Sequence, residues 1–435
     1  MTKITPIIIL CFLVLVLVPP PASARKRVDY TIDLAFENLN FIPHRERHAL
    51  NHQETLDLEA GLTYHNEKNL KINLKPRLRI DFADTHRNRY IPNEAYLKFY
   101  GPHFEIGAGM MIKGRGVASF YNPTNFQNRR DYADNGYTPE TLGDLMVSAS
   151  CLLGRWGPLT DFFIEAALLP LFLQTLLPEN DTRFAVKGTR GLVPYEMDVA
   201  QATQNFLNSM AFSIGAGASL SSFDWSLLYY HGPERDPGFY FTTNTAGALR
   251  LKPFYYTTDS LGINGEFATG SFVFSLEAAL NLTGINDFKT HTLAGSTENV
   301  IPSSYFQFIP GVSYEKANIF GQGQLTLKLE YLGEDDRNTS ILKETRPFKN
   351  DLFAGVRYAF NNTRQSEIDL GVIKDLSNVE TLLMVSVSSK IVREFKLGIQ
   401  GVVVNRSGDQ FQPLSFFENN SYIMTRVSYA FGGGF

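Results

Sequence analysis

Apolar and polar side chains alternate along most of this 435-residue chain, and the alternation constrains the fold more than any other feature. The clearest stretch is 70–82, where Leu, Ile, Pro and Phe occupy the even positions and Lys, Asn, Arg and Asp the odd positions. Only an extended strand separates these sets, because successive side chains of a strand point to opposite faces. The stretch is also longer than the usual globular strand of about five or six residues. The pattern predicts a long strand with one apolar face and one charged face.

The same pattern recurs at 28–36, 323–331 and 394–404. These polar faces carry too many charges to pack against a second sheet, and the apolar faces are too continuous to be left in water. A closed barrel with lipid outside and water inside satisfies both faces and removes unpaired strand edges. We therefore predict an all-β fold, a transmembrane antiparallel up-and-down β-barrel. After the N-terminal run, no stretch has the roughly 18–20 apolar residues that a membrane-spanning helix needs.

About eighteen alternating segments can be counted, and we expect 16–18 strands. The connections between them alternate between short and long, as the turns and outer loops of bacterial barrels do. We take 251–268 as one strand, because splitting it would break this alternation. The expected strands are 27–37, 54–65, 69–82, 93–100, 103–113, 143–153, 161–170, 208–220, 223–231, 251–268, 271–282, 303–315, 323–333, 351–360, 366–374, 380–390, 394–405 and 420–435.

The first 24 residues differ from the rest of the chain. Lys3 precedes an unbroken apolar run at 7–18, prolines follow at 19–21, and small residues occupy 22–24. This order is typical of a secretory signal peptide. We expect removal of 1–24 and a single barrel domain at 25–435, located in the outer membrane of a bacterial cell. The one remaining cysteine, Cys151, allows no internal disulfide.

Composition and motifs exclude several classes of function. Forty Lys+Arg residues against 44 Asp+Glu residues leave no basic excess for nucleic-acid binding. A single cysteine after position 24 excludes a C-x-x-C-H haem site and a Cys-based zinc cluster. No Gly-x-Ser-x-Gly elbow or phosphate-binding loop stands out, so we expect neither an enzyme nor a cofactor. His44, His48 and His52 would share one face of a helical loop, but they lack the HExxH arrangement, and we interpret them as a solvated loop rather than a metal site.

The end of the chain adds a resemblance to a known class of proteins. Apolar residues alternate through Tyr429 and Phe431, and the last residue is Phe435. This ending resembles the C-terminal signal of bacterial outer-membrane barrels, which implies that Tyr429, Phe431 and Phe435 are recognised by the barrel-assembly machinery. The segments EAYL at 94–97, FEIGAG at 104–109 and NPTN at 122–125 are similar to a strand pair and loop of uncharacterised porin-like proteins. The chain resembles porin-like families over its whole length after residue 24.

A barrel of this kind places the polar strand faces around a wet lumen. Two interpretations of its charges remain open: they favour the passage of anions, or they solvate the lumen and pair with one another. Carboxylates on the same wall include Asp57, Glu59, Asp81, Glu94 and Glu105. The basic residues expected to line the pore are Lys71, Lys75, Arg77, Arg79, Lys98, Lys113 and Arg115.

The long connection 114–142 is a candidate constriction. The third loop of general porins folds inward and narrows the pore, and the resemblance implies the same for this segment. It would bring Arg129, Arg130, Asp131 and Asp134 towards the wall. An ordinary outer loop is the alternative, and 171–207 is an equal candidate for a lid.

These features together predict an outer-membrane channel for passive diffusion of small hydrophilic solutes or ions. Its expected partners are outer-membrane lipid, the barrel-assembly machinery and the solutes themselves, while the sequence leaves homo-oligomer formation open. The alternative is a non-transport barrel that serves as an adhesin, a scaffold or a sheath for a partner protein.

Overall fold

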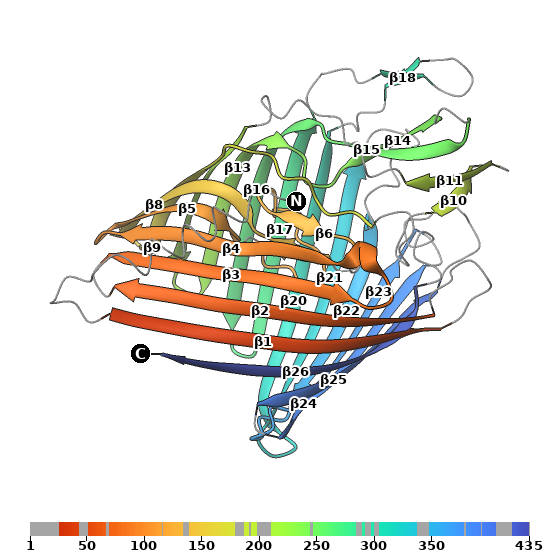
Figure 1. Ribbon diagram of the computed structural model, residues 1–435. Helices are drawn as coiled ribbons and strands as arrows, with labels where there is room; N and C mark the ends of the chain where they lie inside the picture. The colour runs from red at the N-terminus through yellow and green to blue at the C-terminus, as the bar shows by residue number, and fades with distance from the viewer. Residues whose placement is uncertain are drawn as a thin grey trace.

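The computed structural model describes residues 26–42, 51–66, 69–114, 116–133, 139–178, 187–190, 193–197, 210–243, 247–283, 289–291, 297–299, 304–336, 348–377, 380–392, 394–405 and 420–434. Within them, 18 strands form one sheet that closes on itself, because β1 (Lys26–Phe41) pairs antiparallel with β26 (Tyr422–Gly434). Figure 1 shows these two strands side by side. The predicted all-β, antiparallel, up-and-down barrel with about 18 strands is confirmed.

The other barrel strands follow one another around the ring in sequence order, each antiparallel to its neighbours. They are β2 (His52–Asn66), β3 (Leu70–Asp81), β4 (Arg89–Tyr100), β5 (Phe104–Met111), β8 (Asp144–Trp156), β9 (Leu159–Leu169), β12 (Ala211–Leu220), β13 (Phe223–Pro233), β16 (Thr257–Thr269), β17 (Phe272–Thr283), β20 (Tyr305–Ile319), β21 (Gly323–Asp336), β22 (Asn350–Ala359), β23 (Glu367–Asp375), β24 (Thr381–Val392) and β25 (Phe395–Asn405).

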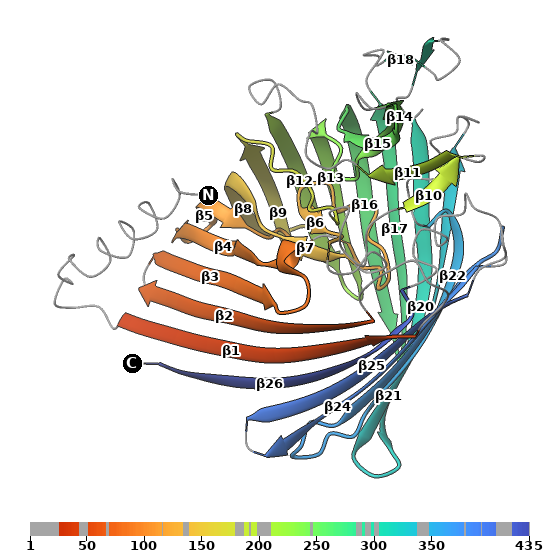
Figure 2. The same cartoon turned by 45° about the vertical axis from the view of Figure 1, so that its right-hand side comes forward.

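One expected strand is wrong in its extent. The stretch 251–268 holds the end of β15 (Leu249–Phe254) and most of β16. Only β16 belongs to the barrel, whereas β15 joins β14 (Gly238–Thr243), β11 (Val193–Met197) and β10 (Lys187–Arg190) in a separate four-stranded sheet. Because β15 lies outside the barrel, the alternation of short and long connections survives the split. Figures 1 and 2 show this small sheet at one end of the barrel.

The remaining described elements are short and lie in the long connections. A 3-10 turn, η1 (Thr85–Arg87), follows β3, and β6 (Arg129–Asp131) pairs with β7 (Glu140–Leu142) between β5 and β8. β18 (Lys289–His291) pairs with β19 (Thr297–Asn299) between β17 and β20. The tight turns at the opposite end use residues suited to them: Gly270, between β16 and β17, has a φ of 58°, which glycine adopts without a steric penalty.

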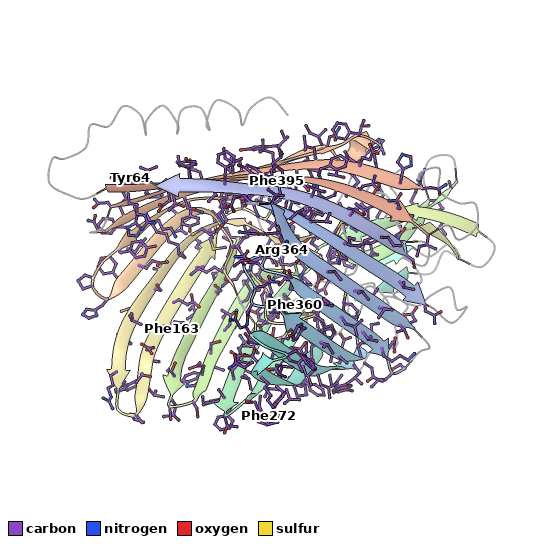
Figure 3. The ribbon with its side chains drawn as sticks, turned by 90° about the horizontal axis from the view of Figure 1, so that it is seen from below. Tyr64, Phe163, Phe272, Phe360, Arg364 and Phe395 are labelled. Carbon is purple, nitrogen blue, oxygen red and sulfur yellow. The ribbon has the colours of Figure 1, made fainter. Side chains whose placement is uncertain are left out.

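Side chains alternate between the two faces of the barrel. On β4, Leu97 and Phe99 are 48% and 43% exposed, while Lys98 between them lies on the opposite face. Exposed apolar residues recur in the same way on β5, β13, β17 and β25, for example at Ile106 and Ile399. Figure 3, which looks at the barrel from below, shows side chains on both faces of its strands. Among the residues described, no helix has the length and hydropathy that crossing a membrane would require.

Two clusters of buried apolar residues lie inside the ring of strands. The first draws on the inner faces of β1 and of β20 to β26: Leu39, Phe41, Phe120, Ile309, Leu332, Phe348, Ile373, Leu382, Val402, Val404 and Tyr422. The second draws on β5 to β17: Met111, Phe126, Met146, Ala167, Leu169, Ala211, Leu228, Tyr230 and Ala279. Each cluster contains one phenylalanine, Phe120 or Phe126, from the connection between β5 and β8, which therefore enters the barrel.

Candidate functional site

Residues 116–133, which we call the strap, lie inside the barrel. The strap follows β5 in sequence, yet it contacts inner-face side chains of β12, β16, β17 and β21. These strands lie across the ring from β1 to β4. Figures 1 and 2 both place β6, the last part of the strap, within the ring of barrel strands. The strap is therefore a part of the described chain that occupies the lumen.

A carboxylate on β17 binds the first half of the strap. Glu277 Oε2 accepts hydrogen bonds from the backbone N–H groups of Val117 and Ala118, at 2.8 and 3.1 Å. Its Oε1 accepts from the backbone N–H and the hydroxyl of Thr124, at 2.9 and 2.8 Å. Glu277 is fully buried. Charge-assisted hydrogen bonds of this kind are about twice as strong as neutral ones.

A second carboxylate, on β21, binds the middle of the same half. The backbone N–H of Ser119 donates to both Glu330 oxygens, at 2.9 and 3.0 Å. Lys328 lies beside it, with Nζ 3.2 Å from Glu330 Oε1 and 2.5 Å from the Ser119 hydroxyl oxygen. Two wall carboxylates thus accept hydrogen bonds from four backbone N–H groups of the strap, of which that of Thr124 is buried.

Aromatic side chains hold the strap at two further points. The Phe120 ring stacks on Phe353 with 5.4 Å between centroids and meets Phe348 edge-on at 5.5 Å. The Phe126 ring stacks on Tyr230 at 6.1 Å. Such pairs contribute roughly 0.5–1.5 kcal/mol beyond the area they bury.

The second half of the strap is tied to the connection between β13 and β14. Asp236 accepts hydrogen bonds from Arg130 Nη1, from the Tyr132 hydroxyl at 2.8 Å and from the Tyr121 hydroxyl at 3.4 Å. The Arg130 guanidinium also lies 5.0 Å from the centre of the Tyr121 ring. Burial alone would lower the pKa of Arg130, but the Asp236 carboxylate raises it well above its ordinary value. Burial and Asp236 raise the pKa of Tyr132, so this cluster keeps a protonated arginine and a neutral tyrosine at physiological pH.

Asp131 connects the strap to the charged wall of the barrel. Its Oδ2 lies 2.7 Å from Arg89 Nη2, and the neighbouring backbone exchanges hydrogen bonds with Leu176. Burial raises the pKa of Asp131 above its ordinary value of 3.8, although Arg89 opposes the shift. Arg129, by contrast, donates to the backbone oxygen of Gly143 at the base of the same connection.

Most of the expected pore-lining residues form ion pairs on the inner face. Lys75 pairs with Glu94 at 3.8 Å, Lys98 with Glu105 at 2.7 Å, and Lys113 with Glu165 at 3.2 Å. Arg77 pairs with Asp57 and Glu140, and Arg79 with Asp57 and Glu37. Lys71 instead lies 6.0 Å from the centre of the Tyr96 ring. These pairings favour the second interpretation of the charges, in which they neutralise one another.

The buried members of this set are removed from water. The side chains of Arg79 and Asp57 are 4% and 6% exposed, and Arg87 and Asp81 form a similar buried pair at 2.8 Å. The side chain of Lys75 is 40% exposed and those of Lys98 and Glu105 are about a quarter exposed, so solutes in the lumen can meet them. The charges on β3 therefore divide into a buried group near one end and an accessible group near the other.

Sequence reasoning missed several residues that the fold brings to the lumen. Glu277 and Glu330 were not singled out, although each is an isolated carboxylate at an inward position of an alternating strand, which is the signal that could have found them. A second set of accessible charges lies on β22, β23 and β25, where Arg357 and Lys396 both approach Glu367, at 2.7 and 2.9 Å.

Other predicted features lie partly or wholly outside the described residues: the segment 1–24, Arg115, Asp134, Phe435, His44 and His48. Tyr429 and Phe431 are described, with their rings 5.7 Å apart and Tyr429 4.6 Å from Phe395. Of the candidate lid 171–207, the residues 187–190 and 193–197 form β10 and β11. In the described part of the chain, no three His, Cys, Asp or Glu side chains gather in a way that could hold a metal ion.

Comparisons with known proteins place the fold. A scan against protein-family models found no matching family. A search of curated proteins found no match either. Among solved structures, OccK8 (OprE) of Pseudomonas aeruginosa matches with a TM-score of 0.51 and 10% identity, over 94% of this chain and 98% of that one.

Two further solved structures are similarly close. A BenF-like porin of Pseudomonas fluorescens matches with a TM-score of 0.50 and 9% identity, over 94% of this chain and 99% of that one. Wzi of Escherichia coli, described as an outer-membrane protein involved in group 1 capsule assembly and as a carbohydrate-binding β-barrel, matches with a TM-score of 0.52 and 10% identity, over 92% and 84% of the two chains. At these identities the likeness shows the fold alone. The chain has a barrel fold that is shared with bacterial outer-membrane porins.

Proposed function

We propose that this chain is an outer-membrane channel through which small hydrophilic solutes or ions diffuse passively. The observation that carries the proposal is the strap, an ordered segment held inside the barrel by wall carboxylates and aromatic contacts. An eighteen-stranded barrel is wide enough for an aqueous passage, so an internal segment is needed to restrict what passes. The partly exposed charges of Lys75, Lys98 and Glu105 would line the part of the lumen that remains open.

The fold by itself does not separate a channel from a binding barrel, since both BenF-like porin and Wzi share it. The strap favours the channel, because an adhesin or a scaffold acts through its outer loops and gains nothing from a constriction in the lumen. In this proposal the exposed apolar belt contacts outer-membrane lipid. Tyr429 and Phe431 belong to the signal that the assembly machinery recognises, and no catalytic step takes place.

We expect weak selectivity between small anions and cations. Five of the expected basic residues, Lys75, Arg77, Arg79, Lys98 and Lys113, have a carboxylate within ion-pair distance. Neighbouring opposite charges cancel beyond about a Debye length, roughly 8 Å at physiological salt. A solute would therefore meet local dipoles rather than a wall of one sign.

Single-channel recording in a planar lipid bilayer tests the proposal. Purified mature protein should insert and give stable ohmic steps, with a reversal potential close to zero under a salt gradient. Insertion without steps, from protein that migrates as a folded barrel before heating, would contradict the channel and support the binding-barrel alternative.

A further inference from the structure

The first half of the strap depends on two acidic side chains from strands far away in the sequence. Glu277 and Glu330 lie on the inner faces of β17 and β21, and they are 0% and 1% exposed. Their partners are the backbone N–H groups of residues 117, 118, 119 and 124, the Thr124 hydroxyl and, at Glu330, the Lys328 ammonium. Every one of these partners is a hydrogen-bond donor, so the two sites are built for acceptor-only groups.

We propose that Glu277 and Glu330 are positioning residues that set the width of the passage by holding the strap against the far wall. This proposal rests on the channel function proposed above and assigns its constriction to specific side chains. The two carboxylates lie on the wall formed by β17 and β21, while the accessible charges of Lys75 and Lys98 lie on β3 and β4. Holding the strap against β17 and β21 keeps the space beside β3 and β4 open.

The chemistry requires carboxylates rather than amides at these positions. A glutamine has one acceptor oxygen, and its NH₂ group would face the strap N–H groups that now donate to the other carboxylate oxygen. At position 277, an amide turned one way would leave the N–H groups of Val117 and Ala118 without an acceptor. Turned the other way, it would leave the N–H of Thr124 without one, while the Thr124 hydroxyl could still donate to Asn264 Oδ1. A buried donor without an acceptor is costly, so the strap would leave the wall.

The rest of the strap explains why this loss would shift the segment without unfolding the barrel. Phe126 remains packed on Tyr230, Gln127 remains bonded to the Ser213 hydroxyl, and Arg130 remains bonded to Asp236. The 18-stranded ring closes through strand pairing and does not use the strap. Around residues 117–124, the packing of Phe120 on Phe348 and Phe353 would be the contact left to hold the strap, and it satisfies no backbone N–H group.

The test compares single-channel conductance of wild type with Glu277→Gln, Glu330→Gln and the double variant. We expect the double variant to conduct about twofold more or higher, with each single variant in between, because current follows the cross-section of the narrowest part. Glu394→Gln is the control: this exposed carboxylate lies in the turn between β24 and β25 and pairs with Lys390 rather than with the strap, so the conductance of this variant should stay at the wild-type value. Wild-type conductance in a folded double variant would overturn the proposal.

A reversible crosslink provides rescue and an independent readout. A Cβ placed at Gly262 on β16 would lie 3.2 Å from Thr124 Cβ, close to the roughly 3.5–4.5 Å of disulfides. In a Cys151→Ser background, the oxidised and reduced states of Thr124→Cys with Gly262→Cys are compared within the same protein, so that the loss of the Thr124 hydroxyl is common to both states. In the double glutamine variant, oxidation should restore the wild-type value and reduction should raise it again. Failure of the oxidised crosslink to lower the conductance would also overturn the proposal.

The rate of crosslinking separates this proposal from the channel function. It can be measured on detergent-solubilised protein that conducts no current, by a gel shift after addition of oxidant. We expect the double glutamine variant to crosslink about fivefold more slowly, because residue 124 leaves the wall more often. Equal rates would exclude a positioning role for the two carboxylates even if wild type forms no channel. If wild type gives no current steps but the double glutamine variant crosslinks more slowly, the channel function is contradicted and the positioning role is not.

Discussion

Two regions of the inner wall, at the same end of the barrel, bury different kinds of side chain: one buries ion pairs and the other buries apolar residues. The ion-paired wall, on β1 to β3 with η1, is built from Glu37, Asp57, Arg79, Asp81 and Arg87. The apolar wall, on β20 to β25, is built from Ile309, Leu332, Ile373, Leu382, Val402 and Val404. Both sets point inward and both are buried.

The difference shows that an inward position in a barrel does not have to be polar. On the apolar wall, the aromatic side chains of Phe120 and Phe348 cover the strands, so apolar residues are favoured there. On the ion-paired wall each charge is removed from water and is stable only because its partner is removed with it. Burial itself stabilises the apolar wall, whereas the ion-paired wall is stable only while each charge keeps its partner.

The largest effect should come from breaking a pair on the ion-paired wall. Asp57→Ala leaves Arg79 and Arg77 without their shared carboxylate, and removal of one buried partner costs roughly 3–5 kcal/mol. Urea-induced unfolding followed by tryptophan fluorescence should show this loss. A change below about 1 kcal/mol would mean that water reaches Arg79 and that the two walls do not differ in this way.

Shortening a side chain on the apolar wall should lower the free energy of unfolding by somewhat less. The loss should depend only on the side-chain volume that is removed. Leu382 is completely buried, so Leu382→Ala should lower the free energy of unfolding by about 2–5 kcal/mol. Leu382→Met, which conserves volume, should cost less than about 1.5 kcal/mol in the same unfolding assay. Equal losses for both variants would argue against simple apolar packing.

Asp131 joins the strap to Arg89 on β4, beside the ion-paired wall, and its protonation should make the stability of the protein depend on pH. Because burial raises its pKa, the folded protein takes up this proton at a higher pH than the unfolded chain. Stability should therefore rise as pH falls through the window between the raised pKa and 3.8, by up to about 1.4 kcal/mol per pH unit. Asp131→Asn should lose this component, so the difference in unfolding free energy between wild type and variant should change with pH. Parallel pH profiles would contradict the assignment.

Charge reversal at an accessible lumen residue should have the smallest effect on stability, but it should change the ion selectivity of the current. Lys75 is partly exposed beside Glu94, so Lys75→Glu should cost no more than about 1 kcal/mol. Two adjacent carboxylates should nevertheless move the reversal potential under a salt gradient towards cation preference. The same charge reversal at Arg77, whose side chain is only 12% exposed, should destabilise the barrel. An unchanged reversal potential for Lys75→Glu would show that this wall does not face the ion path.

The alternation of side chains was enough to predict the closed barrel, its number of strands and the up-and-down order. This worked because a strand has a strict period of two, and lipid outside a barrel demands an apolar side chain at every second position. The error at 251–268 arose because β15 has the same period as a barrel strand, and nothing local shows that it pairs with β11 and β14 instead.

Tertiary structure alone decided what fills the lumen. The alternation could place Glu277, Leu382 and Arg79 on the inner face, but not what each would meet there. Glu277 meets the strap across 153 residues of sequence, and Arg79 meets Asp57 through the register of two strands. Contacts of that range depend on how the ring closes and where the connection between β5 and β8 turns inward. Which inward positions are ion-paired, apolar or bound to the strap is therefore a property of the closed barrel and not of any single strand.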